Sequence, residues 1–438
     1  MKSGMPMERA YRRAARRPIG SRPTPARHPS PTHGNTLDAV PRLAPHIPSV
    51  PESGIRRILE LSFEVDDVIA LGVGEPDVPV APHIREAARV AWAEDRTDYT
   101  ANAGIPELRA ALVEKLRRDN GLEVQTEQVW VTVGATQALY QAMTLTLGAG
   151  DEALVPDPGY TTFSMGARML QAEPVTYPLL PERGFLPDMA ELERLVTART
   201  RVLVVNSPSN PLGAVFPRET LRELLAFARR HDLWVISDEV YEYFVHDAEH
   251  VSVASLQEPG EQRVLSAFSL SKTYALTGVR VGYLVVPTGM TTTMRTVQEA
   301  TISCVSAPAQ WAGVAAVTGD QSHVRQAIAH YRENLDAATA LLEERGIRHL
   351  RPTGAFYLWI DVSHASDGDV AGWAERFLLR DRVAVAPGSA FGRSGEGWIR
   401  VCVAADRDAL LEGLRRLPAP GDAVPGPAPA TDAATPAS

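Results

Sequence analysis

The sequence of 438 residues contains few cysteines and few lysines, and it lacks long apolar runs. Its two cysteines, Cys304 and Cys402, lie far apart and form neither a disulfide framework nor a metal-ligand spacing. This pattern is typical of proteins in the reducing cytoplasm and predicts no bound metal. No segment approaches the roughly 20 consecutive apolar residues that span a bilayer, so we expect no membrane contact.

Only three of the 44 basic residues are lysines, namely Lys2, Lys115 and Lys272. Because nearly all other basic residues are arginines, a lysine that remains indicates a position at which arginine cannot replace it. Lys2 lies in a basic N-terminal segment and Lys115 in the charged stretch 114–118, so both are interpreted as solvent-exposed. Lys272 follows an apolar strand and two serines, which makes it the first candidate for chemistry.

The net charge of −9 conceals a basic N-terminal segment. Residues 1–27 carry one lysine and seven arginines against one acidic residue, a balance of +7, so the rest of the chain carries −16. An acidic body argues against a nucleic-acid enzyme. The Pro-, Arg- and Ser-rich residues 1–50 predict a disordered arm, although this composition also suits a transit peptide or a nucleic-acid-binding segment. Residues 418–438, mostly Pro, Ala, Gly, Thr and Asp, predict a disordered tail.

Between these ends, short β-branched runs alternate with amphipathic helical patterns. This alternation predicts an α/β domain with a largely parallel sheet. A strand, a helix and another strand after a long helix over 322–345 predict a second, smaller α/β unit. We assign 85–325 to the large domain, and 51–84 with 326–417 to the small one. Strands of the large domain are expected at 129–133, 153–155, 202–205, 234–236, 264–268 and 283–286.

Ligands of open α/β sheets bind beyond the carboxyl ends of the strands, and four predicted strand ends carry notable residues. Gly134, Ala135 and Thr136 open a helix, where free N–H groups suit an anion, although a plain tight turn has the same sequence. Asn210 lies between prolines that fix its loop. Asp238 ends an apolar strand, either as a helix cap or as a buried counter-charge.

The fourth strand end contains Ser269, Ser271 and Lys272, and Arg280 follows eight residues after the lysine. Hydroxyls, an arginine fork and a helix N-terminus together make a phosphate cradle. A lysine beside such a cradle can form an imine with an aldehyde cofactor. Near a second cation and away from water, the Lys272 amine should lose its proton more easily than a free lysine, whose pKa is about 10.4.

Six segments, met in order along the chain, resemble the class I and II aminotransferases, which are fold-type I pyridoxal-phosphate enzymes related to aspartate aminotransferase. The resemblance runs from about residue 53 to about residue 416. It implies a large domain with a mostly parallel seven-stranded sheet, a smaller α/β domain, and pyridoxal 5'-phosphate as the cofactor. The matching segments are 72–77, Tyr99 with 103–109, Asn210 with Pro211, 238–241, 269–273 with Gly278 and Arg280, and Arg400.

The resemblance implies a role for each cofactor contact. Lys272 holds the cofactor as a Schiff base and later moves the substrate's α-proton. Asp238 pairs with the ring nitrogen, while Asn210 and Tyr241 hydrogen-bond the ring's phenolic oxygen. The remaining contacts are a stacked aromatic ring, Tyr160, and the groups that hold the phosphate, namely Gly134, Ala135, Thr136, Ser269, Ser271 and Arg280.

The resemblance also implies how substrate and subunits meet. Arg400 grips the substrate's α-carboxylate through a two-pronged hydrogen bond, assisted by Asn210 and Gly74, although a structural salt bridge is the alternative role for this arginine. Tyr99 reaches the phosphate of a neighbouring subunit, so the active unit is expected to be a homodimer. Leu212 stands where the family often has threonine, a change from which we expect little effect. Since no further lysine is present for a side-chain carboxylate, strict aspartate specificity gains no support, although an arginine could bind that group.

Two enzyme functions fit this pattern. The first is an aminotransferase that moves an amino group between an α-amino acid and a 2-oxo acid in alternating half-reactions. The second is a lyase on the same scaffold, of the β-lyase or cyclopropane-forming kind, which begins from the same cofactor linkage. A transcription regulator with an aminotransferase-like domain requires a DNA-binding helix pair, which the Pro-rich residues 1–50 do not provide. We therefore predict an aminotransferase of amino-acid metabolism.

Overall fold

The computed structural model describes residues 41–422. The predicted arm and tail lie outside the described residues, except for 41–50 and 418–422. Residues 41–48 are the described part of a first unit and contain the start of a short 3-10 helix, η2 (Ile47–Ser49). The second unit begins at Ser49 and contains all three sheets. No helix within the described range is long and apolar enough to cross a membrane.

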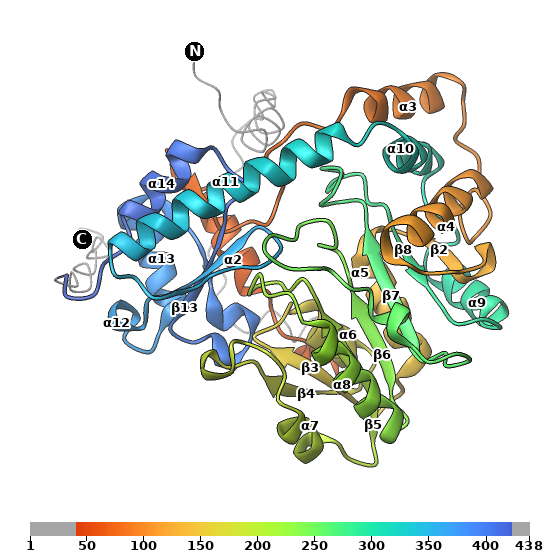
Figure 1. Ribbon diagram of the computed structural model, residues 1–438, viewed down its shortest axis with the longest axis horizontal. Coiled ribbons are helices and arrows are strands. Elements are labelled where there is room, and N and C mark those ends of the chain that lie inside the picture. The colour runs from red at the N-terminus through yellow and green to blue at the C-terminus, as the bar shows by residue number, and fades with distance from the viewer. Residues whose placement is uncertain (1–40, 423–438) are drawn as a thin grey trace, which may run out of the picture. The chain divides into compact units, whose positions relative to one another are not determined.

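A seven-stranded sheet forms the larger part of the second unit (Figure 1). Its strand order is β2-β8-β7-β6-β5-β3-β4, and all strands run parallel except β8. Strands buried on both faces have continuous apolar runs rather than alternation, which explains why these runs stand out in the sequence. The bounds are β2 (Val129–Thr132), β3 (Glu152–Asp157), β4 (Glu173–Pro178), β5 (Thr200–Asn206), β6 (Trp234–Asp238), β7 (Val264–Ser269) and β8 (Gly282–Val285).

Helices pack on this sheet through apolar stripes. In α8 (Arg218–Arg230), Leu221, Leu224 and Leu225 are buried at helical spacing, and this helix contacts β6. The N-terminus of α5 (Gly134–Thr146) directly follows β2, and the helix contacts β6, β7 and β8. The other helices of this part of the chain are α3 (Pro82–Ala93), α4 (Pro106–Asn120), α6 (Thr162–Met169), α7 (Met189–Leu195), α9 (Thr291–Thr301) and α10 (Ala307–Thr318).

A smaller sheet has four strands, all antiparallel to their neighbours, in the order β12-β13-β10-β9. A parallel pair of two-residue strands, β1 and β11, lies outside it. The long helix α11 begins near α3 and α10 and ends in the region of α13 and α14 (Figure 1). The bounds are β1 (Ile69–Ala70), β9 (His349–Leu350), β10 (Tyr357–Asp361), β11 (Val383–Ala384), β12 (Ala386–Pro387), β13 (Trp398–Cys402), α2 (Gly54–Ser62), α11 (Ser322–Glu344), α12 (Ser363–Ser366), α13 (Val370–Asp381) and α14 (Arg407–Arg415).

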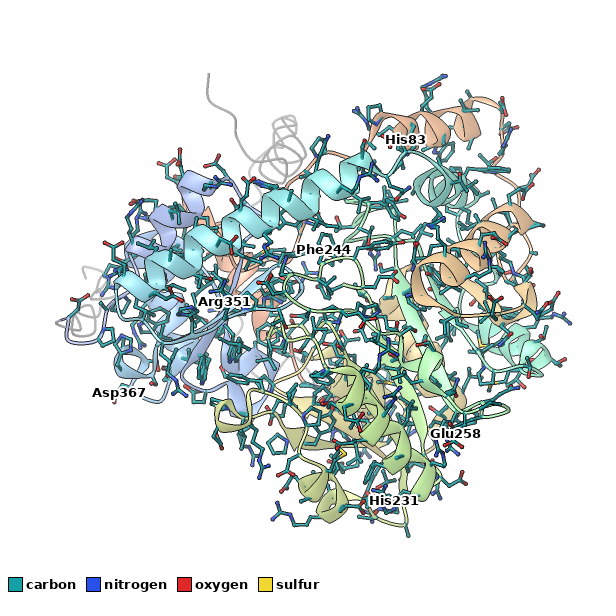
Figure 2. The ribbon with its side chains drawn as sticks, in the orientation of Figure 1. His83, His231, Phe244, Glu258, Arg351 and Asp367 are labelled. Carbon is teal, nitrogen blue, oxygen red and sulfur yellow. The ribbon has the colours of Figure 1, made fainter. Side chains whose placement is uncertain are left out.

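Aromatic packing joins the loop after β6 to the smaller sheet. Phe244, labelled near the centre of Figure 2, is fully buried. Its ring lies edge-on to Phe356, which precedes β10, and 5.8 Å from Tyr331 of α11. Aromatic pairs at such separations add to the free energy of burial. The loop that follows Asp238 is therefore held against the smaller sheet.

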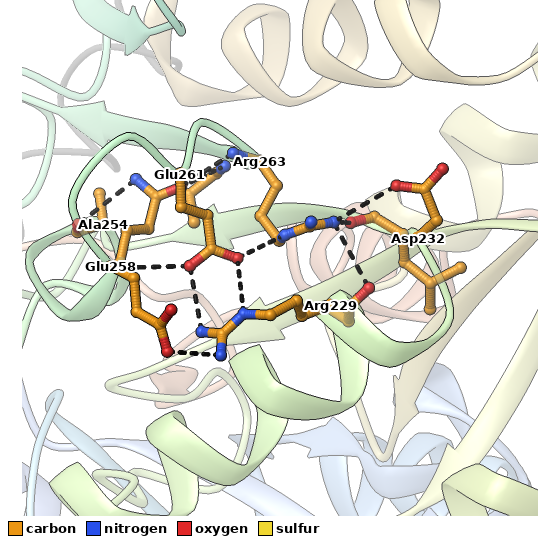
Figure 3. Close-up of polar contacts among 10 residues, drawn as sticks. Arg229, Asp232, Ala254, Glu258, Glu261 and Arg263 are labelled. Carbon is orange, nitrogen blue, oxygen red and sulfur yellow. Dashed lines mark hydrogen bonds and ion pairs between the residues drawn. The ribbon is translucent and has the colours of Figure 1, made fainter.

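Ion pairs hold the start of β7. Glu261 accepts hydrogen bonds from Arg229 of α8 at 3.2 Å and from Arg263 at 2.6 Å (Figure 3). Arg263 also donates to the carbonyl oxygen of Leu233 at 3.0 Å, and Arg229 pairs with Glu258 at 2.6 Å. This network aligns the starts of β6 and β7, the two strands that lead to Asp238 and Lys272.

The predicted fold is confirmed, with one strand of the seven-stranded sheet missed. The six expected strands correspond to β2, β3, β5, β6, β7 and β8. The missed strand, β4, contains Pro174 and Pro178, which a central strand does not tolerate. It lies at the edge of the sheet, and only one of its sides pairs with another strand. The N–H that proline lacks is therefore not needed on the open side.

The interpretation of Lys115 as a surface residue is wrong. This side chain of α4 is 3% exposed, and its amine donates to Asn120 Oδ1 at 2.8 Å and to Glu242 Oε2 at 2.5 Å. The amine also lies 4.9 Å from the ring centre of Phe268 and 5.2 Å from that of Tyr243. A buried ammonium is tolerated here because a carboxylate and an amide neutralise and hydrogen-bond it.

Candidate active site

A cavity of about 320 Å³ lies beyond the carboxyl ends of β5, β6 and β7. It brings together twelve of the fourteen residues that the sequence predicts for the site, and only Gly134 and Tyr99 do not line it. The twelve are Gly74, Ala135, Thr136, Tyr160, Asn210, Asp238, Tyr241, Ser269, Ser271, Lys272, Arg280 and Arg400.

The register of the large sheet explains this convergence. Asn206, the last residue of β5, lies opposite Asp238, the last residue of β6. Ser269 at the end of β7 lies opposite Gly282 of β8, which in turn lies opposite Thr132 at the end of β2. Asp238 lies opposite Ala267, so β7 runs two residues beyond the end of β6. The carboxyl ends of β2, β5, β6 and β7 and the start of β8 therefore meet at one edge of the sheet.

Lys272 points its amine into this cavity. Its Nζ donates a hydrogen bond to the carbonyl oxygen of Gly74 at 2.6 Å, and no carboxylate among the described residues pairs with it. Burial lowers the pKa of Lys272 to about 8, and the charges of Arg400 and Arg280 act in the same direction. A lysine with this pKa is partly neutral near neutrality, as a nucleophile or a general base must be.

Asp238 presents a buried carboxylate to the same cavity. Its Oδ1 accepts a hydrogen bond of 3.3 Å from the backbone N–H of Val240, and no described cation pairs with it. Burial raises the pKa of Asp238 to about 7, and the neighbouring charge of Glu239 raises it further. The predicted alternative of a helix cap is weak, because the residues after Asp238 form turns rather than a helix. A cationic or protonated partner in the cavity would offset the cost of burying this charge.

An anion cradle lies at the N-terminus of α5. Arg280 donates to Ser271 Oγ at 3.4 Å, and Ser269 Oγ accepts from the N–H of Ser271 at 3.1 Å. The first N–H groups of α5 have no partner within the helix, which favours an anion. Gly134 has a φ of +70°, and a Cβ there would lie 2.4 Å from Arg280 Nη2. Gly134 therefore shapes the cradle without lining the cavity, since no other residue would leave room for the guanidinium.

Arg400 of β13 is buried but lacks a carboxylate partner. Its Nη1 donates to Asn210 Oδ1 at 2.8 Å and its Nη2 to the carbonyl oxygen of Gly72 at 2.6 Å. Its Nε is buried without a hydrogen-bond partner among the described residues. The alternative prediction of a structural salt bridge therefore finds no support in the described chain. An arginine held by neutral oxygens keeps its charge available for a ligand's carboxylate.

Among the residues of the cavity wall that were not predicted as site residues, two carry groups that can bind a ligand or tune the site. Tyr357 at the start of β10 lies with its Oη 2.6 Å from that of Tyr241. Arg56 of α2 also lines the cavity, and its guanidinium has no hydrogen bond or ion pair to another described residue. An aromatic residue that begins a strand is usually part of a core, and an arginine on an amphipathic helix is usually on the surface. Neither sequence context distinguishes these residues from ordinary ones.

Tyr99 lies elsewhere. Its side chain is 92% exposed and borders a second concavity, together with Trp92 and the stretch from Cys304 to Pro308. Trp92 is also exposed, at 66%. Tyr99 thus takes no part in the cavity of its own chain, and its predicted role in a neighbouring subunit stays a prediction.

The residues of the cavity fit pyridoxal phosphate. The cradle around Arg280 suits its phosphate, the buried carboxylate of Asp238 suits its ring nitrogen, and the amine of Lys272 suits its aldehyde. Fold and site together define a fold-type I pyridoxal-phosphate enzyme.

Comparisons with known proteins identify the family. The family model described as aminotransferase class I and II matches residues 66–417. An aspartate aminotransferase of Pyrococcus horikoshii is 35% identical over 86% of this chain and 96% of that protein. The aspartate/prephenate aminotransferase of Thermus thermophilus is 38% identical over 82% of this chain and 93% of the relative. The structure of Thermus thermophilus aspartate aminotransferase with maleate superimposes with a TM-score of 0.81, at 36% identity, and covers 86% of this chain and 99% of that one.

The chain belongs to the class I and II aminotransferases. It is an aminotransferase, and pyridoxal phosphate is the cofactor of this family. The predicted resemblance, cofactor and reaction class are confirmed, which decides between the aminotransferase and the lyase.

Proposed function

We propose that this aminotransferase moves an amino group between an α-amino acid and a 2-oxo acid, with Lys272 as the residue that binds the cofactor and transfers the proton. The observation that carries this assignment is the Lys272 amine, which faces the cavity without a carboxylate partner and has a pKa lowered to about 8. Lys115, the other described lysine, is held in a closed ion pair.

The cofactor, when bound, supplies an aldehyde that condenses with amines and a ring that accepts electrons. Asp238 would hold a proton on the ring nitrogen, because a buried carboxylate is stabilised by a cation at hydrogen-bond distance. Tyr241 and the amide of Asn210 would donate to the phenolic oxygen. Ser269, Ser271 and Arg280, with the N–H groups of Ala135 and Thr136, would bind the phosphate, and Tyr160 would cover the ring.

Lys272 would carry the proton between carbon atoms. The amine first leaves the carbonyl oxygen of Gly74. In its neutral form, its Nζ then accepts the α-proton of the substrate and later returns this proton. Arg400 would bind the α-carboxylate through its paired N–H groups, in place of its bonds to Asn210 and Gly72. This grip sets the direction in which the α-hydrogen points.

The wall near α2 supports two classes of substrate side chain. Arg56 offers a guanidinium that no described residue pairs with, whereas Ile55, Leu59, Leu139 and Tyr160 offer apolar and aromatic surface. Relatives are named for aspartate, for aspartate and prephenate, and, in Thermococcus litoralis, for aromatic amino acids. We assign acidic and aromatic α-amino acids as substrates.

The proposal extends to assembly, domains and location. The exposed Tyr99 and Trp92 support a homodimer in which Tyr99 reaches the partner's phosphate site. The two larger sheets, one formed between 129 and 285 and one between 349 and 402, support a large domain over 85–325 and a small one over 51–84 and 326–417. Both cysteines are free, and burial raises the pKa of the Cys402 thiol to about 11, which supports a cytoplasmic protein without a reactive thiol.

A panel of amino acids tests the reaction and the substrate class. Aspartate, phenylalanine and lysine are each mixed with the cofactor-loaded enzyme, and the conversion of bound pyridoxal phosphate to pyridoxamine phosphate is followed by chromatography. We expect conversion with aspartate and phenylalanine but not with lysine. The variant Arg56→Ala should lose rate with aspartate and keep it with phenylalanine. Equal rates with all three donors would contradict the assigned substrate class.

A further inference from the structure

Tyr357 lies in the cavity wall between Arg400 and Tyr241. Strand β10 pairs antiparallel with β13, and Trp359 lies opposite Arg400. Tyr357 and Arg400 are therefore diagonal neighbours on one face of the smaller sheet. The guanidinium carbon of Arg400 lies 4.4 Å from the centre of the Tyr357 ring, within the range of a cation–π contact.

The other end of Tyr357 reaches the residues around Lys272. Its Oη lies 2.6 Å from the Oη of Tyr241, and the two rings meet edge-on at 5.5 Å. A Cβ built on Gly74 would lie 2.0 Å from the same hydroxyl, so the hydroxyl lies directly on the backbone whose carbonyl binds Lys272. One buried side chain thus contacts the carboxylate-binding arginine at its ring and the proposed cofactor contacts at its hydroxyl.

The surroundings favour one direction for the hydrogen bond between the two tyrosines. Burial raises the pKa of both hydroxyls, and the charge of Arg400 opposes this rise most directly at Tyr357. The more acidic hydroxyl is the better donor. The Arg400 guanidinium lies over the Tyr357 ring, and Tyr241 donates into the cavity under the proposed function, so the Tyr241 oxygen accepts from Tyr357.

We propose that Tyr357 is a positioning residue that couples carboxylate binding at Arg400 to hydrogen-bond donation by Tyr241, an inference that rests on the proposed function. A carboxylate bound to Arg400 reduces the positive charge beside the Tyr357 ring. The hydrogen bond from Tyr357 then weakens, and so does the bond that Tyr241 donates into the cavity, because linked hydrogen bonds strengthen one another. Substrate binding thereby changes the proton affinity at the cofactor.

The test is a pH titration of the visible absorbance of the cofactor-loaded protein, with and without maleate as a carboxylate that cannot be transaminated. Tyr357→Phe keeps the ring over Arg400 and removes only the hydroxyl. Tyr283→Phe is the matched control, because the hydroxyl of Tyr283 is buried without a hydrogen-bond partner in the described chain. We expect Tyr357→Phe to raise the titration midpoint by about one pH unit, the equivalent of one hydrogen bond, because the phenolic oxygen loses stabilisation. It should also reduce the further shift that maleate causes.

Each other outcome separates this link from its alternatives. An unchanged midpoint in Tyr357→Phe, or an equal change in Tyr283→Phe, would overturn the proposal. Weaker maleate binding with an unchanged midpoint would overturn it too, since Tyr357 would then serve the carboxylate alone. In a Tyr241→Phe background, the second substitution Tyr357→Phe must leave the midpoint in place, because its partner hydroxyl is gone. The cofactor-loaded wild-type protein should show a visible absorbance band that borohydride removes. If it shows no such band, the proposed function itself is contradicted.

Discussion

The two described lysines occupy opposite environments, although both lie within the protein. Lys115 is closed in by Glu242, Asn120 and two aromatic rings, so its charge is neutralised where it stands. Among the described residues, Lys272 has only the carbonyl oxygen of Gly74 as a hydrogen-bond partner, and three arginines line the same cavity. The comparison teaches that burial alone does not make a lysine reactive. What matters is whether the protein supplies the counter-charge or leaves that position to a ligand.

The largest expected effect comes from removing the reactive amine. Lys272→Ala should abolish the covalent link to pyridoxal phosphate and lower transamination by at least about 10⁴-fold, since both the nucleophile and the general base are lost. The link is measured as the mass of the protein after borohydride reduction. Lys115→Met is the control and should keep the added mass. A Lys272→Ala protein that still gains the mass of the cofactor would contradict the assignment of Lys272.

The second effect concerns stability rather than chemistry. Lys115→Met leaves the buried carboxylate of Glu242 without its cation, which should lower the free energy of unfolding by about 3–5 kcal/mol. The double substitution Lys115→Met with Glu242→Leu should recover most of this loss, because no unpaired charge remains.

Urea unfolding measures these differences. Arg117→Ala is the matched control on the same helix, because Arg117 forms an exposed pair with Glu114, and such pairs contribute about 1 kcal/mol or less. If Lys115→Met and Arg117→Ala lower the free energy of unfolding by the same amount, the ion pair of Lys115 is not shielded from water.

The smallest effect is a pH dependence specific to Lys272 in the cofactor-free protein. Its pKa is about 8 in the folded chain against an ordinary value of 10.5. Between these values the unfolded chain binds the extra proton, so the free energy of unfolding should rise with pH by roughly 2–3 kcal/mol. Below pH 8 both states carry the charge, and the folded state bears its full cost.

The measurement compares urea unfolding of wild type and Lys272→Met from pH 7 to pH 10.5. The difference between the two proteins should shrink as the pH rises. A constant difference between wild type and Lys272→Met would place the Lys272 amine in water.

The sequence predicted those site residues whose type is unusual for their place. An aspartate, a lysine and an arginine beside apolar strands stand out, and the carboxyl ends of β6 and β7 bring Asp238 and Lys272 to one edge. Tyr357 and Arg56 went unnoticed because a tyrosine that begins a strand and an arginine on a helix are ordinary. Their importance comes from contacts with residues distant in sequence, which local patterns do not contain.

Burial of charge was harder to predict than the fold. The charged stretch around Lys115 fits a surface helix, and its partner Glu242 lies 127 residues away. Helical periodicity identifies an apolar stripe but does not show which flanking charge turns inward. The edge strand β4 was missed for a related reason, since Pro174 suggests a loop until the neighbouring strand is known.

The helix α2 has a consequence for engineering this enzyme. It contacts α13 and β12, and Arg57 pairs with Glu375 at 3.0 Å, so its position depends on the smaller sheet and not on the strand ends. A methyl group at Gly74 or Gly134 would displace Tyr357 or Arg280 in the cavity wall, which closes those positions to a mutant library. Ile55, Arg56 and Leu59 are not fully buried. A library built on α2 could therefore change which amino acid is accepted while the machinery that handles the cofactor stays constant.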